Sequence, residues 1–285
     1  MSNSTSAPEL PPETRPVLNQ IAGRQRRFTI QVKLVSLIIV LALLLLLKFL
    51  GLDFGFMQKW SGFILKGTGF TLLVSVMAIS LACIIALVGA LGRLSRNPIA
   101  NGIASFYVSL VRGTPLLVQV FMWYLALPQL GQALEEAGLT GAQGLLTLPA
   151  IPAGILALGV CYGAYMTETF RAGIQSINIG QTEAAQALGM TESQITRRII
   201  LPQALRVIIP PVSNEFIAMI KDSSLVSLMG VWEISYRAQK IGRRYFRSLE
   251  MLIMAALFYW ILCIILQAIQ ERIETYMARG ERKRH

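Results

Sequence analysis

GQTEAAQALGMTESQITRRIILPQALRVIIPP, residues 180–211, is a polar stretch in a chain that is otherwise mostly apolar. Glu183 and the alanines that follow it favour a helix, and Gly189 stands where a residue in the left-handed conformation would end that helix. Thr191 and Gln194 have the spacing of a capping box, so a second helix is expected to begin there. The stretch therefore predicts two short helices that meet at a glycine.

The details of these two helices suggest a docking element. Glu183 is expected near the positive end of the first helix dipole, and small alanines allow another backbone to approach closely. The second helix carries an apolar stripe and is expected to be interrupted at Pro202. The first helix thus has a shape that suits insertion into a partner.

Two other interpretations of this stretch need weighing. Helix, glycine and helix followed by Arg197 and Arg198 also suit a DNA-reading helix-turn-helix. Such a motif needs a third helix and its own core, whereas apolar segments resume within a few residues on both sides, which disfavours it. A cytoplasmic loop that merely links two membrane spans stays open as the alternative.

The composition indicates a membrane protein. The chain has 285 residues, of which 54% are hydrophobic and 14% charged, and the apolar residues are clustered. Several windows reach the ~20 residues that cross a hydrocarbon core of ~30 Å, which predicts a polytopic α-helical protein. The formal net charge of +11 lies mainly in loops and tails, as expected of a topology signal, and nucleic-acid binding is not expected.

The chain lacks the residues of most catalytic and metal sites. Its cysteines, Cys83, Cys161 and Cys263, all lie in apolar stretches far apart, so neither disulfides nor a metal site are expected. Its only histidine is His285, and no phosphate-binding GxxxxGK[ST] loop occurs. The sequence predicts no enzyme and no cofactor of its own, and any ATPase is expected on a separate chain.

The polar stretch also carries a known signature. The residues Glu183, Ala184, Ala185, Gly189, Ile199, Leu201 and Pro202 resemble the EAA motif of the membrane subunits of bacterial ABC importers. Four further segments resemble the polar amino acid permease subfamily: 112–115 (RGTP), 162–165 (YGAY), 168–177 (ETFRAGIQSI) and 221–225 (KDSSL). The resemblance covers roughly residues 62–275.

This resemblance implies a fold, a function and partners. The fold is an all-α polytopic bundle of the type I ABC importer permease, with a five-helix core and one extra N-terminal transmembrane helix. The function is that of a permease subunit in an ATP-driven, binding-protein-dependent importer of polar amino acids. The partners are a cytoplasmic ABC ATPase dimer that receives the EAA helix, a second permease subunit, and an extracytoplasmic amino acid binding protein.

The chain divides into four predicted parts, with both termini cytoplasmic in a bacterial inner membrane. They are a disordered basic tail (1–32), an extra uncleaved transmembrane helix (33–52), the permease domain (62–275, with the EAA loop at 176–206) and a second basic tail (276–285). The spans expected within the permease domain are 63–91, 106–127, 151–174, 207–232 and 251–269.

The span at 207–232 is unusually polar, and Pro210 and Pro211 are expected to break its start. Ionisable groups at membrane depth are costly unless they pair or face water, so this span is expected to line a transport route. The candidate pathway residues are Glu168, Arg112, Glu215, Lys221, Asp222 and Ser223. The alternatives are that Glu168 and Arg171 form a structural ion pair, and that Lys221 and Asp222 lock neighbouring helices together.

One basic segment conflicts with the positive-inside rule. Arg237, Lys240, Arg243, Arg244 and Arg247 fall in a loop that the predicted order of spans places outside. An amphipathic helix at the membrane surface, over residues 232–247, would accommodate them, and an acidic partner is the alternative.

A gradient-driven secondary transporter or channel is the alternative function. Its expected sign is an inverted repeat with paired broken helices, and only one strongly broken polar span is evident here.

Overall fold

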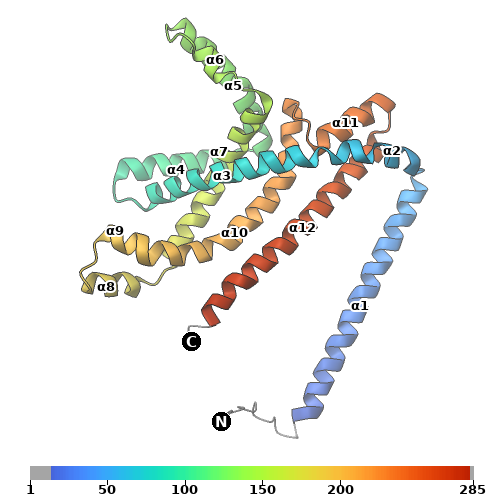
Figure 1. Ribbon diagram of the computed structural model, residues 1–285, viewed down its shortest axis with the longest axis horizontal. Coiled ribbons are helices and arrows are strands. Elements are labelled where there is room, and N and C mark those ends of the chain that lie inside the picture. The colour runs from blue at the N-terminus through green and yellow to red at the C-terminus, as the bar shows by residue number, and fades with distance from the viewer. Residues whose placement is uncertain (1–13, 283–285) are drawn as a thin grey trace, which may run out of the picture. The chain divides into compact units, whose positions relative to one another are not determined.

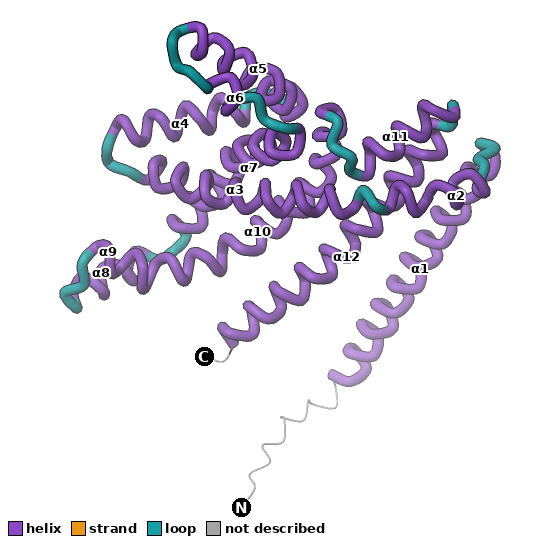
Figure 2. Tube along the Cα trace, turned by 45° about the horizontal axis from the view of Figure 1, so that its top comes forward, coloured by secondary structure: helices purple, strands orange, loops and turns teal. Residues whose placement is uncertain are grey.

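The computed structural model describes residues 14–282 and shows only helices and short connections among them (Figures 1 and 2). The chain separates into two compact units, with the boundary between residues 54 and 55. Each unit is described by itself below.

The first unit is essentially one long helix, α1 (Thr14–Phe49). Disorder was predicted for residues 1–32, and for residues 14–32 this is wrong, because they are helical. Several good helix formers follow Pro16, among them Leu18, Gln20 and Ala22, and proline is tolerated in the first turn, where its missing N–H would have no partner. Residues 1–13 lie outside the described part. The membrane crossing expected at 33–52 stays a prediction.

The second unit holds eleven further α-helices in the described part of the chain. In order they are α2 (Phe54–Leu65), α3 (Thr68–Leu94), α4 (Pro98–Arg112), α5 (Leu116–Glu136), α6 (Ala142–Leu146), α7 (Ala150–Gln175), α8 (Ile179–Ala187), α9 (Glu192–Ile195), α10 (Leu201–Asp222), α11 (Ile234–Tyr245) and α12 (Ser248–Arg282). A π-helical turn, Thr196–Ile200, leads into α10, and a 3₁₀ segment, Ser223–Met229, follows it.

Helices α3 and α7 form the centre of the unit, packed through small residues. A Cβ added at Gly159 would lie 2.7 Å from Leu81 Cδ2, and one at Gly163 would lie 2.7 Å from Ile85 Cγ2. Alanines 78, 82, 86 and 90 on α3 are fully buried in the main core. Small residues at such spacings let two helix backbones approach closely, as is common in membranes.

By length and hydropathy, the described residues contain three candidate spans, 54–94, 150–175 and 248–275, or four if a bent pair counts as one. The predicted span 151–174 is confirmed as α7, and 251–269 lies within α12. The span predicted at 106–127 is wrong as a continuous helix, because α4 and α5 meet at an angle of 109°. Pro115 causes this break: its own backbone is extended, with ψ 135°, and it disfavours helical backbone at the residue before it.

The structure also differs from the prediction for the span at 207–232. Helix α10 continues through Pro210 and Pro211, and Pro202 falls in its first turn, where proline does not interrupt a helix. Packing of Ala204 and Ile208 into the main core holds α10 in place despite the missing backbone donors. The α-helix ends at Asp222, ten residues before the predicted end of the span.

The break between α2 and α3 is fixed by a close backbone contact at Gly67. A Cβ added there would lie 2.6 Å from both Glu233 C and Ile234 N, which belong to the start of α11. Backbone atoms of a packed helix terminus cannot move aside cheaply, so only glycine fits.

Replacing Gly67 with alanine is therefore expected to destabilise the protein by about 1–3 kcal/mol, the usual cost of overpacking. Thermal unfolding in detergent measures the change. Gly62→Ala in α2 is the matched control, because a Cβ there meets nothing within 4 Å and alanine favours the helix. Equal melting temperatures for Gly67→Ala and the wild type would contradict this account of the break.

Candidate functional site

The segment between α7 and α10 forms two short helices that meet at a glycine, as predicted. Asn178 caps α8 by accepting a hydrogen bond from the Gly180 N–H at 2.8 Å. Gly189 has φ +75°, the left-handed conformation expected of it. Thr191 and Gln194 form the predicted capping box at the start of α9.

The position of Glu183 differs from its prediction. Helix α8 begins at Ile179, four residues before Glu183, so this carboxylate lies in the middle of the helix and not at its positive end. The start of the helix was missed because Ile179 and Gly180 are poor helix formers by propensity, and the Asn178 cap outweighs them.

Helix α8 exposes apolar side chains. Ile179 is 73% exposed and Leu188 is 82% exposed, at the two ends of the helix. Glu183 and Ala184 are also exposed, whereas Ala185 is buried against the rest of the segment. Among the remaining motif residues, Ile199 and Leu201 are half-buried and Pro202 is exposed. An exposed helix that presents two large apolar side chains suits docking into a partner.

The two helices that flank this segment are packed tightly near it. A Cβ added at Gly173 of α7 would lie 2.3 Å from Ile208 Cγ1 of α10. Figures 1 and 2 show α8 and α9 at one end of α10, with α11 at its other end. A force on α8 would therefore reach α7 and α10 together.

Glu168, a predicted pathway residue, lies between two arginines. Arg93 Nε is 3.2 Å from its Oε1, and an Arg171 guanidinium nitrogen is 2.7 Å from its Oε2. Arg93 also donates to the Ser105 hydroxyl of α4. The contacts join α3, α4 and α7, which is the structural ion pair that the sequence offered as the alternative. Arg93 was missed as a partner because it is 75 residues from Glu168.

A second group of polar side chains gathers where α7, α10 and the end of α4 meet. Tyr162 donates a hydrogen bond to Asp222 Oδ2 at 2.7 Å. Glu215 is half-buried and lies seven residues before Asp222 on α10, which places both carboxylates on one face of that helix. Arg112 lies over the Tyr165 ring, 5.6 Å from its centroid. We call Arg112, Tyr162, Tyr165, Glu215 and Asp222 the acid–tyrosine cluster.

This cluster contains three of the six predicted pathway residues and excludes the others. Arg112, Glu215 and Asp222 belong to it, joined by two tyrosines that the sequence analysis named only as part of the segment 162–165. Tyr162 is detectable as a partner only once α7 and α10 are packed together, because 60 residues separate it from Asp222.

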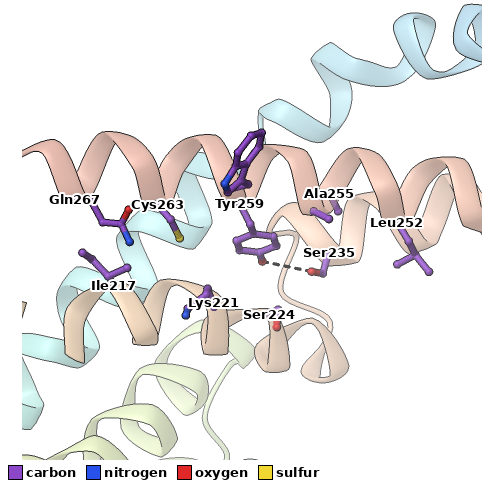
Figure 3. Close-up of a pocket in the computed structure, with 11 residues that line it drawn as sticks. Ile217, Lys221, Ser224, Ser235, Leu252, Ala255, Tyr259, Cys263 and Gln267 are labelled. Carbon is purple, nitrogen blue, oxygen red and sulfur yellow. Dashed lines mark hydrogen bonds between the residues drawn. The ribbon is translucent and has the colours of Figure 1, made fainter. Parts of the chain in front are cut away.

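Lys221 and Ser223 lie elsewhere. Lys221 is exposed and lines an open groove of about 570 Å³ between α10 and α12, together with Ile217, Tyr259, Cys263 and Gln267 (Figure 3). Ser223 is fully buried and donates to the Ile220 carbonyl at 2.7 Å. The Lys221 side chain and the Asp222 side chain thus lie on different sides of α10.

Comparison with known proteins identifies the family. The model of the family described as binding-protein-dependent transport system inner membrane component matches residues 78–279. The L-cystine transport system permease protein TcyB of Bacillus subtilis (strain 168) is 39% identical over 214 residues, which cover 75% of this chain and 86% of that protein. The probable amino-acid ABC transporter permease protein PatM of Vibrio harveyi is 36% identical over 221 residues, which cover 78% and 94%.

Solved structures agree with the sequence comparison. A crystal structure of an amino acid ABC transporter with histidines superposes with a TM-score of 0.69 at 33% identity, covering 79% of this chain and 99% of that one. An inward-facing MetNI methionine ABC transporter, 20% identical, shares the fold with a TM-score of 0.58. The predicted all-α permease fold is confirmed. The chain belongs to the family of binding-protein-dependent transport system inner membrane components, the multi-pass permease subunits of ABC importers.

Proposed function

We propose that this chain couples ATP hydrolysis on a separate cytoplasmic ATPase to the import of polar amino acids, with α8 as the helix that docks on the ATPase. The observation that carries the proposal is the exposure of Ile179 and Leu188 on a capped helix that contains the EAA residues. Apolar side chains exposed at both ends of a short helix are costly in water and favourable in a partner's cleft.

The coupling follows from how α8 is connected. Two ATPases that close on ATP would move a helix seated in each of them. Because α7 and α10 are tightly packed at Gly173 and Ile208, they would tilt together when α8 moves. ATP drives the change because it binds the closed state better than the open one, which shifts the permease between inward-open and outward-open arrangements.

The acid–tyrosine cluster is the proposed contact for the solute. An amino acid carries an ammonium group and a carboxylate, which need an acceptor and a donor in a desolvated site. Glu215 and Asp222 supply acceptors, and Arg112, which lies over the Tyr165 ring, supplies a donor. Relatives named for L-cystine, arginine and glutamine transport support an amino acid as the solute.

The assembly includes a second permease subunit, an ATPase dimer and an extracytoplasmic binding protein. The placement of α8 and α11 at opposite ends of α10 supports a cytoplasmic α8 and an extracytoplasmic α11. The basic residues beside both ends of the chain support a cytoplasmic N-terminus and a cytoplasmic C-terminus.

The experiment that tests the proposal is ATP hydrolysis by the co-purified complex in lipid, with the binding protein in excess and a panel of amino acids. Stimulation by a cationic, acidic or amide amino acid is expected and would identify the solute. Purification of the chain without any ATPase, together with solute flux down a gradient, would refute the proposal.

A further inference from the structure

A row of aromatic rings joins α2 to α11. Phe56 and Trp60 each lie 5.5 Å from the Tyr245 ring, and Trp60 lies 6.0 Å from Phe63, measured between centroids. The row continues from Phe63 to Trp232 at 6.5 Å and from Trp232 to Tyr236 at 5.4 Å. Two segments about 170 residues apart in sequence thus share one aromatic surface.

Basic side chains lie over these rings. Lys240 Nζ is 3.9 Å from the Trp232 centroid, and the Arg237 guanidinium is 4.9 Å from the Phe63 centroid. Arg244 lies 5.7 Å from the Tyr245 ring, and Lys59 lies 6.0 Å from the Trp60 ring. We call the rings and these cations, together with Arg243, the basic aromatic surface.

No carboxylate belongs to the two elements that form this surface. Residues 55–66 and 234–247 contain seven Lys and Arg and no Asp or Glu. Of the adjacent acids, Asp53, which precedes α2, is exposed and has an interaction of its own. Glu233 is fully buried and accepts from Tyr259 and from the Tyr236 N–H, and Glu250 is paired with Arg247 at 2.9 Å. The cations at 240, 243 and 244 are exposed and remain able to bind an external anion.

The helix that presents these cations is held firmly. Ile234, Ala238 and Ile241 of α11 pack into a buried core with Met57 and Ile64 of α2 and with the start of α12. Glu233 caps the first turn of α11, and Gly67 packs against its backbone. Helix α11 is thus amphipathic as predicted, with one face in a core and the other face basic.

The surface borders side chains suited to hydrocarbon. Phe246, which follows α11, is 95% exposed, and Leu249, Leu252 and Trp260 of the adjoining α12 are also exposed. Aromatic rings with basic residues beside an apolar band are typical of the membrane–water interface.

We propose that the basic aromatic surface binds the phosphate headgroups of anionic phospholipids. The rings lie at headgroup level, and Lys240, Arg243 and Arg244 contact the phosphates. This binding gives the cations outside the membrane a lipid partner, which accounts for their departure from the positive-inside rule. The proposal does not depend on which solute is transported.

Tryptophan quenching in nanodiscs tests the proposal with the full-length chain. The nanodiscs contain phosphatidylcholine and a minor fraction of phosphatidylglycerol, with bromine on the acyl chains of only one of the two lipids. All variants carry Trp123→Phe and Trp260→Phe, so that only Trp60 and Trp232, which lie in the surface, report. Quenching per brominated lipid is expected to be several-fold greater with brominated phosphatidylglycerol. The triple variant Lys240→Gln/Arg243→Gln/Arg244→Gln is expected to bring the quenching ratio of the two lipids close to 1, because each surface cation near an anionic headgroup contributes about fivefold.

Two matched variants separate charge from folding. Lys240→Arg/Arg243→Lys/Arg244→Lys keeps the charge and should keep the preference. Arg24→Gln/Arg26→Gln/Arg27→Gln removes three exposed arginines from α1 and should also keep it. Equal quenching by both lipids in the wild type, or an unchanged preference in the triple glutamine variant, would overturn the proposal. So would loss of the phosphatidylglycerol preference on adding the binding protein, which would assign the surface to a protein partner.

Discussion

Replacing Leu188 with glutamate is expected to lower the affinity of the permease for its ATPase by at least about a hundredfold. Burying a leucine side chain contributes about 1.5–3 kcal/mol, and an unpaired carboxylate in its place adds a desolvation cost. A loss of about 2.7 kcal/mol already corresponds to a hundredfold change. The measurement is the amount of ATPase that co-purifies with tagged permease, together with basal ATP hydrolysis.

The control for this substitution is Leu139→Glu. Leu139 is 59% exposed in the connection between α5 and α6, so the same chemical change is made on an exposed leucine away from α8. ATPase retention should be that of the wild type. Full retention by Leu188→Glu as well would show that α8 is only a linker between two spans.

The second large effect is expected at Asp222. Asp222→Asn keeps a side-chain oxygen that can accept the hydrogen bond from Tyr162, but it removes the negative charge of the carboxylate. Hydrogen bonds to charged groups contribute about 1.5–3 kcal/mol, so solute uptake into proteoliposomes should fall at least about tenfold. Basal ATP hydrolysis should persist, because Asp222 is remote in sequence from α8 and belongs to the acid–tyrosine cluster.

Two further variants locate the cause of that loss. Tyr162→Phe removes the hydrogen bond and keeps the charge, so its uptake should fall less than that of Asp222→Asn. Glu136→Gln neutralises an exposed carboxylate at the end of α5 and should leave uptake unchanged. Unchanged uptake by Asp222→Asn would remove the cluster from the transport route.

Local features of this protein were predictable from the residues themselves. The turn at Gly189, the capping box at Thr191 and Gln194, and the helix over 151–174 all depend on interactions between neighbours in sequence. The basic amphipathic helix at α11 was likewise visible from the spacing of its charges. Such features need no knowledge of which segments meet.

The tertiary structure decided which side chains of these elements contact one another. The sequence determined a polytopic helical protein, two short helices that meet at Gly189 and a polar helix, because composition, periodicity and caps are local properties. Packing alone placed Glu168 between Arg93 and Arg171. It also brought Asp222 to Tyr162 and left Lys221 in the groove between α10 and α12. It likewise brought the Phe63 ring against Trp232. Helical periodicity states which residues share a face, but the partner of that face depends on contacts between segments far apart in the chain.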